Sequence, residues 1–172
     1  KNVERIPHYY YAPVIRRYCE LLRDLLGERL VSMMLFGSVA RGDWKKDSDI
    51  DILIVAEGWE DKPAWVRIEE LRRAREALEE SIEYLEALRA GYFPIIQNYT
   101  LSIKEANRFN RVFLDAVVDG IILYDKDEFL TGVLHSLRKR LEEIGSVRVM
   151  LPDKSFYWIL KDVKAGEVIT LG

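Results

Sequence analysis

Two spacings of apolar residues run through this chain, and together they predict a domain built from helices and strands. Four segments carry apolar residues at the helical spacing of three to four: residues 9–26, 64–90, 103–118 and 127–144. Four compact apolar runs predict strands: residues 31–36, 49–55, 94–101 and 121–124. The first of these runs has no polar alternation beyond one serine, which is typical of a strand buried on both faces.

Local signals mark the ends of several of these elements. Gly27 follows the first helix and Gly91 the second, and glycine commonly ends helices because it adopts left-handed backbone conformations. Ser102 can cap the third helix, with Glu105 on its first turn, and Asp127 can cap the fourth. A short helix is also expected just after residue 37, between the first two strands.

The 64–90 segment is expected to be the longest helix. Its apolar stripe consists of Ile68, Leu71, Leu78, Ile82 and Leu85. Arg and Glu occupy the other faces, many of them four residues apart, so we expect those faces to be solvated.

The pattern changes after Gly145. Three short β-like pieces follow, at residues 147–151, 156–160 and 167–171. No repeat or low-complexity linker divides the chain. We therefore expect an α/β (α+β) domain over 1–145, with a small mixed β-sheet flanked by helices, and a β-rich C-terminal extension over 146–172 packed on it.

Composition narrows the class of protein. The chain has 172 residues, of which 49% are apolar, and a net charge of −3, which argues against sequence-blind nucleic-acid binding. It shows no secretory signal pattern and no apolar run long enough to span a membrane. One cysteine, Cys19, excludes an internal disulfide, so a cytoplasmic location is expected. Charged residues make up 32% while Asn and Gln are rare, a pattern that suits a thermophile.

The candidate functional residues lie in the segment LFGSVARGDWKKDSDIDILIV, residues 35–55. Asp49 and Asp51 are two residues apart in an expected strand, so their side chains share one face, opposite to the isoleucines between and after them. Two adjacent carboxylates repel each other unless a cation lies between them or one is protonated. Hard oxygen ligands favour Mg²⁺ or Mn²⁺.

Gly37 and Ser38 stand between the preceding strand and the short helix. Such a turn presents backbone N–H groups to an anion, and glycine allows a ligand to approach closely. Arg41 follows one turn later, within reach of a phosphate. A metal-bound nucleoside triphosphate would satisfy both the acids and this turn.

These residues resemble a known signature. Gly-Ser at 37–38, Arg-Gly at 41–42 and Ser-Asp-Ile-Asp at 48–51 are similar to the DNA polymerase β-like nucleotidyltransferases in their minimal form. The stretches GYFPIIQNYTLSIKEA, LDAVVDGIILYD and FYWILKDVKAGEVI also resemble one archaeal-type branch of that family.

The resemblance implies a function. The family transfers a nucleoside monophosphate from an NTP, here expected to be ATP, to a hydroxyl acceptor. Asp49 and Asp51 would be the catalytic residues and would hold Mg²⁺ or Mn²⁺. Four residues would bind the nucleotide: Gly37, Ser38, Arg41 and Ser48.

One departure bears on catalysis. The family usually places a third acid on the strand after the long helix, where this chain has Gln97 and Asn98. Glutamine cannot take a proton at neutral pH. Three readings stay open: a one-metal enzyme, a nucleotide binder with little turnover, or an acid from elsewhere. The candidate acids are Asp115, Asp119 and Glu57.

The resemblance also suggests partners. Small members often pair with an HEPN-domain protein as toxin and antitoxin, the transferase being the antitoxin, which would make the acceptor a protein hydroxyl; a homodimer is the other expectation. The alternative is a catalytically weak or inactive module that binds nucleotide or a partner. Simpler interpretations remain for two features: Asp49 and Asp51 could be solvated acids of an edge strand, and Arg41 could pair with Asp43 or Asp47.

Overall fold

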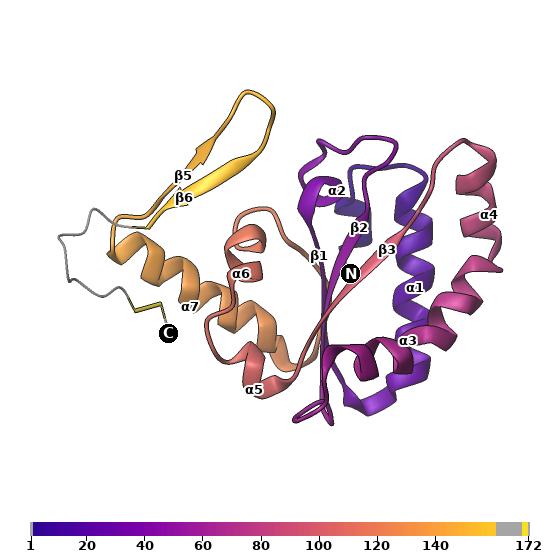
Figure 1. The fold of residues 1–172 in the computed structure, drawn as a ribbon, viewed down its shortest axis with the longest axis horizontal. Coiled ribbons are helices and arrows are strands. Elements are labelled where there is room, and N and C mark those ends of the chain that lie inside the picture. Colours follow the sequence, from indigo (N-terminus) through magenta and orange to yellow (C-terminus); the bar gives the residue numbers. More distant parts are fainter. Residues whose placement is uncertain (1, 161–169, 172) are drawn as a thin grey trace.

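A four-stranded mixed sheet forms the centre of the computed structural model, which describes residues 2–160, 170 and 171 (Figure 1). Its strands lie in the order β3-β2-β1-β4. β1 pairs antiparallel with β2 and β4, and β2 pairs parallel with β3. The strand bounds are β1 Leu30–Phe36, β2 Ile50–Ala56, β3 Ile96–Leu101 and β4 Ile121–Asp125. The expected α/β (α+β) class with a small mixed sheet is confirmed.

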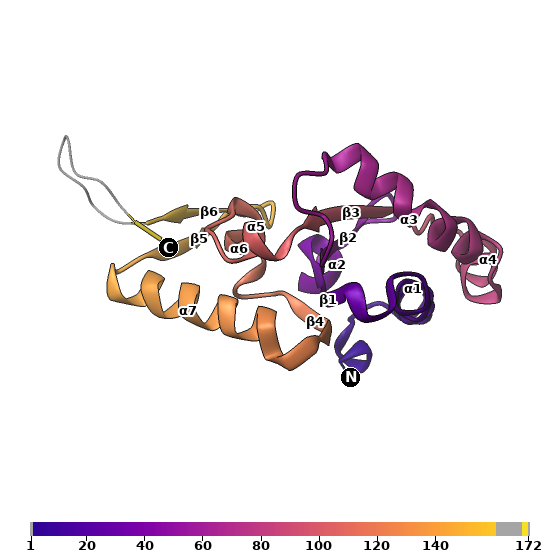
Figure 2. The same ribbon diagram turned by 90° about the horizontal axis from the view of Figure 1, so that it is seen from below.

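Helices cover both faces of the sheet (Figures 1 and 2). One face is covered by α1 (Tyr11–Leu26), α3 (Ala64–Glu79) and α4 (Ile82–Arg89). The other face is covered by α5 (Ile103–Ala106), α6 (Arg111–Ala116) and α7 (Phe129–Glu143). The short α2 (Gly37–Arg41) follows β1 directly, and 3₁₀ turns occupy Val3–Arg5, Gly27–Arg29 and Lys126–Glu128.

β1 lies between two hydrophobic cores, and each of its residues is buried. Met33 and Leu35 pack in the core under α1 and α3, whereas Met34 and Phe36 pack in the core under α6 and α7. The prediction of a strand buried on both faces is therefore confirmed, because a central strand with helices on each side has no solvated face.

The segment expected to form one helix over 64–90 forms two, so that prediction is wrong. Ser81 has extended backbone angles, and its hydroxyl accepts a hydrogen bond from the backbone N–H of Tyr84 at 3.3 Å. This N-cap starts a new helix, which rotates the apolar stripe away from the core. As a result Ile82 is 71% exposed and Leu85 is 42% exposed.

The expected 103–118 helix also divides, into α5 and α6. Ser102 and Glu105 form a complete capping box at the start of α5, which confirms the predicted cap. Asn110 starts α6 by accepting a hydrogen bond from the backbone N–H of Val112 at 3.1 Å. A second side-chain cap only eight residues after Ser102 explains why the helix is interrupted.

Asp127 does not cap the helix that follows it. Asp127 itself has a positive φ of 51°. The cap is Asp125 at the end of β4, whose carboxylate accepts hydrogen bonds from the backbone N–H groups of Leu130 and Thr131, each at 2.9 Å. Ser32 of β1 donates to the same carboxylate at 2.6 Å, so this acid joins the sheet to α7.

The extension after Gly145 forms an antiparallel hairpin of β5 (Val147–Met150) and β6 (Phe156–Ile159). The Trp158 indole N–H donates to the backbone oxygen of Leu114 at 3.0 Å, which attaches the hairpin to α6. The third expected piece, 167–171, falls on residues of which only 170 and 171 are described. A domain limit at residue 145 stays a prediction.

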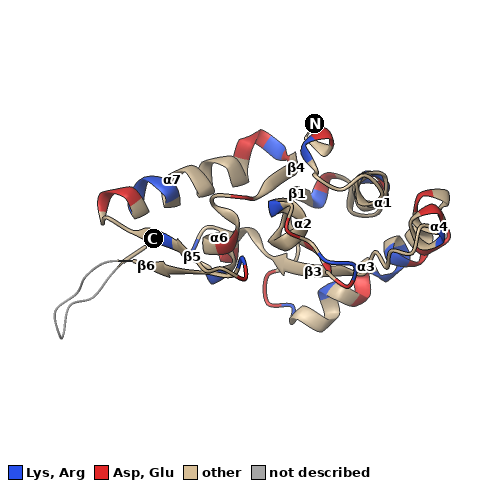
Figure 3. Ribbon diagram, turned by 90° about the horizontal axis from the view of Figure 1, so that it is seen from above, with Lys and Arg blue, Asp and Glu red and all other residues tan. Residues whose placement is uncertain are grey.

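Acidic and basic residues are mixed along α4 and α7 (Figure 3). In the part of the chain that the structure describes, no helix combines the length and the apolar character needed to cross a bilayer.

Candidate active site

The Gly37–Ser38 turn and the two acids meet at one end of the sheet. Because β1 and β2 run antiparallel, the end of β1 lies beside the start of β2, and Phe36 is paired in register with Asp51. Asp49 directly precedes β2. Asp51 faces the α6 side of the sheet, whereas Ile50 and Ile52 are fully buried on the α1 side.

Gly37 permits a very close approach of Asp51. Its φ is +75°, a backbone conformation that residues other than glycine adopt only at a cost in free energy. A Cβ atom at this position would lie 2.3 Å from the Oδ2 atom of Asp51. Glycine is therefore required here both by the turn and by the carboxylate packed against it.

α2 begins beside the acids without a side-chain cap. The residue before the helix, Phe36, has no side-chain acceptor, so the first backbone N–H groups, from Gly37 onward, lack a cap. The helix ends after one turn at Gly42, which has a left-handed φ of +81°. Ser38 is half-buried in this first turn. This geometry suits an anion that approaches the turn.

Arg41 lies between several acids. Its Nε atom donates to the Oδ2 atom of Asp43 at 3.2 Å, which is one of the pairings that the sequence left open. Its positive charge also lowers the pKa values of Asp51 and Asp115, against the stronger effect of burial. Ser48 stabilises the loop before β2, because its hydroxyl accepts a hydrogen bond from the backbone N–H of Lys45 at 2.8 Å.

The charges of the site act on one another. Burial and the adjacent negative charge of Asp49 raise the pKa of Asp51 to about 6. Asp115 adds a smaller effect in the same direction. Burial raises the pKa of Tyr99 as well, and the charges of all three carboxylates raise it further. Asp49, Asp51, Asp115 and Tyr99 therefore share one electrostatic environment.

The donor set at this place fits a divalent cation. Asp49 and Asp51 provide hard oxygen atoms, and burial together with the adjacent charge of Asp49 disfavours the ionised form of Asp51, an effect that a cation beside both carboxylates would offset. Among the described residues, no group of three or more His, Cys, Asp and Glu side chains lies close enough to hold a metal ion. Within the described part of the chain, a cation at this place would therefore have the carboxylates of Asp49 and Asp51 available.

The position where a third acid was expected carries Gln97, which is paired in register with Asp51. Of the three other acids considered, Glu57 follows the far end of β2, about 20 Å along the strand. Asp119 forms an ion pair with Arg148. Asp115 of α6 is the one whose charge acts on Asp51. The hydrophobic pattern of the sequence did not predict that Asp115 lies near Asp51, because packing in the second core is what brings α6 to the site.

Comparisons with known proteins identify the family of this chain. A sequence profile described as "Nucleotidyltransferase domain" matches residues 15–114. The candidate protein adenylyltransferase MJ1305 of Methanocaldococcus jannaschii is 24% identical over 152 residues, covering 87% of this chain and 94% of that protein.

Two solved structures are similar to this chain, and the first of them supports the fold. Spectinomycin adenyltransferase AAD(9) from Enterococcus faecialis, determined with ATP and spectinomycin, has a TM-score of 0.50 at 15% identity, covering 77% of this chain and 67% of that one. A toxin–antitoxin structure with AMP-PNP has a TM-score of 0.46 at 19% identity, covering 75% and 90%. The expected resemblance and enzyme class are confirmed. Since the profile spans more than half of the chain, this protein belongs to the nucleotidyltransferase family.

Proposed function

We propose that this protein transfers adenosine monophosphate from ATP to a hydroxyl group of another protein, with Mg²⁺ or Mn²⁺ held by Asp49 and Asp51. The observation that carries the proposal is the carboxylate of Asp51, which packs against the uncapped Gly37 turn and lies close enough to Asp49 for the two charges to interact. A protein acceptor is supported by the candidate protein adenylyltransferase of Methanocaldococcus jannaschii, which resembles 87% of this chain.

Each residue has a role in this proposal. The backbone of Gly37 and Ser38 binds the terminal phosphates, and Arg41 offsets their negative charge. A divalent cation held by Asp49 and Asp51 would supply electrostatic stabilisation of the negative charge in the reaction. The acceptor oxygen forms a bond to the α-phosphorus as the bond to the leaving diphosphate breaks, and the hydroxyl proton passes to a base. Ser48 holds the loop that carries Asp49.

We assign the role of that base to Asp115. Its partial burial raises its pKa, which makes the carboxylate a better proton acceptor than an ordinary aspartate. The amide of Gln97, at the position of the usual third acid, cannot accept this proton. Asp115 would thus replace the missing acid from a helix instead of a strand.

Replacing Asp115 tests this assignment. Asp115→Asn is expected to lower the transfer rate by about 100-fold, which is typical for loss of a general base, and to leave the ATP dissociation constant within about twofold. Rates are measured by label transfer from ATP, with Asp127→Asn, on the exposed 3₁₀ turn, as the matched control. Full activity of Asp115→Asn would place the base elsewhere without affecting the assignment of Asp49 and Asp51.

The function itself is tested with labelled ATP, Mg²⁺ or Mn²⁺, and proteins that co-purify with this chain. Label transfer that disappears in Asp49→Asn is expected. One observation favours a second candidate, a catalytically inactive nucleotide-binding module: β3 has no acid beside Asp51. ATP binding without transfer to any of the acceptors would support that module over the enzyme.

The partner follows from the family resemblance and remains a prediction. An HEPN-domain protein is expected among the proteins that bind this chain, and its tyrosine hydroxyls are the acceptors to test first. Affinity purification followed by mass spectrometry identifies such a partner. Recovery of no HEPN protein would argue against a toxin–antitoxin pair, and the mass of the purified chain in solution would show whether it forms a homodimer.

A further inference from the structure

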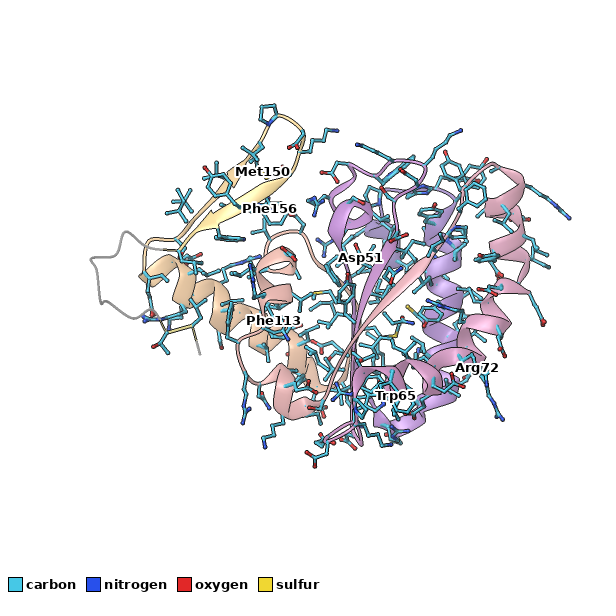
Figure 4. The ribbon with its side chains drawn as sticks, in the orientation of Figure 1. Asp51, Trp65, Arg72, Phe113, Met150 and Phe156 are labelled. Carbon is cyan, nitrogen blue, oxygen red and sulfur yellow. The ribbon has the colours of Figure 1, made fainter. Side chains whose placement is uncertain are left out.

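The C-terminal hairpin returns to the site from the far end of the chain. Phe156 is the first residue of β6, in the hairpin that β5 and β6 form (Figures 1 and 4). The guanidinium carbon of Arg41 is 5.3 Å from the centre of the Phe156 ring. Arg148 of β5 lies over the same ring at 4.9 Å. A side chain of the extension thus contacts the arginine that follows the Gly37 turn.

The hairpin is fixed in this position by contacts on both of its strands. Arg148 of β5 forms an ion pair with Asp119, and both side chains are largely buried, at 18% and 20% exposed. Trp158 of β6 donates its indole N–H to the backbone oxygen of Leu114. The two residues contacted, Leu114 and Asp119, lie on either side of Asp115 in the sequence. The hairpin therefore packs against the region of α6, and through Phe156 it also contacts Arg41 of α2.

The two faces of the hairpin differ. Phe156 and Trp158 are half-buried against the domain, whereas Tyr157 and Ile159 point outward and are 48% and 45% exposed. This alternation follows the strand period of two. Phe156 is therefore on the face that belongs to the site, and its neighbour Tyr157 is on the face that does not.

Arg41 needs such a contact to be held in one place. A free arginine side chain samples many rotamers, and ordering it opposes binding of a phosphate. Here Asp43 accepts from its Nε atom at 3.2 Å, and the ring of Phe156 covers the guanidinium group. A cation over an aromatic ring is attracted to the negative face of the ring, an interaction that is stronger where water is excluded. Arg41 and Asp43 are only 18% and 12% exposed.

We propose that Phe156 is a positioning residue, which holds the Arg41 guanidinium toward the polyphosphate of the bound nucleotide, so that the C-terminal hairpin is part of the nucleotide site. This inference rests on the proposed function, because it assigns the substrate contact to Arg41. It extends the site from the strand–turn–helix segment of the signature to a hairpin that the signature does not contain.

Phe156→Leu tests the inference, because leucine keeps an apolar side chain but removes the aromatic ring. We expect the KM for ATP to rise about tenfold, while kcat changes less than about threefold. Phe156→Tyr keeps the ring and is expected to retain the KM of the unmodified chain within about twofold. Tyr157→Leu, on the outward face of the same strand, is the matched control and is expected to change neither constant.

A double-mutant cycle separates positioning from a general effect on stability. In an Arg41→Ala background, Phe156→Leu is expected to raise the KM no further, because the residue that the ring positions is absent. An equal increase with and without Arg41, or a Phe156→Leu variant that matches Tyr157→Leu, would overturn the inference while leaving the proposed function in place. An unmodified chain that neither binds ATP nor transfers label would overturn both.

Discussion

Asp51→Asn is expected to lower nucleotidyl transfer by about 1,000-fold or more and, at neutral pH without metal, to make the folded protein more stable. The activity falls because an amide is a poor ligand for a hard divalent cation and carries no charge to hold it. The stability rises because Asp51 is partly buried beside Asp49, which disfavours its ionised form. Loss of function and gain of stability thus come from the same carboxylate.

The pH dependence of the stability gain follows from the raised pKa of Asp51, about 6 in the folded state against 3.8 for the unperturbed group. Between these values the folded state binds more protons than the unfolded state, so stability falls as pH rises through this window and stays lower above it. Asparagine does not titrate. The gain from Asp51→Asn is therefore expected to be on the order of 1 kcal/mol at pH 7.5, reduced by solvent screening, and close to zero at pH 3.5.

Label transfer and thermal unfolding in EDTA measure the two effects. The matched control is Asp47→Asn, an exposed acid of the same loop, which is expected to change neither quantity. Retention of more than a tenth of the transfer rate by Asp51→Asn would mean that this carboxylate is not a catalytic metal ligand. A lower melting temperature of Asp51→Asn at pH 7.5 would mean that the carboxylate is stabilised by contacts other than those described.

The sequence predicted the strand–turn–helix–strand segment well because its signals are local. β1, the Gly37 turn, α2 and β2 follow one another directly, so hydrophobic period, glycine position and the spacing of Asp49 and Asp51 are enough to place them together. Asp115 and Phe156 come from α6 and from the hairpin, and although both lie in stretches that resemble the archaeal-type branch, no local spacing places them beside Asp51 or Arg41. Their approach to the site depends on the packing of the second core, which the spacing of residues does not encode.

Helix ends were predicted less well, for a related reason. The apolar period continues through 64–90 and through 103–118, yet single side chains start new helices at Ser81 and Asn110. At the start of α7 the capping carboxylate comes from Asp125 instead of Asp127. One or two side-chain hydrogen bonds determine where each of these helices begins. The helix propensity of the sequence changes only gradually, so it does not locate these positions.

Arg67 shows where the expectation of a solvated helix face is wrong. It lies on α3, among the Arg and Glu residues expected to be exposed, but it is only 6% exposed. It donates hydrogen bonds to the backbone oxygens of Trp59 and Lys62 at 2.8 Å, and to that of Thr100 at 3.1 Å. It also pairs with Glu105 at 2.6 Å. One guanidinium group thus joins α3, the loop after β2, the outer strand β3 and the start of α5.

Arg67→Ala is therefore expected to lower the free energy of unfolding by about 3–5 kcal/mol, because it leaves three backbone oxygens without their donor and opens a cavity beneath α3. Denaturant unfolding with a constant m-value measures the change. Arg73→Ala, at an exposed position of the same helix, is the matched control and is expected to stay within about 0.5 kcal/mol of the unmodified protein. Equal stabilities of the two variants would show that water replaces the donors of Arg67 at the edge of the sheet, which would make this buried arginine dispensable for folding.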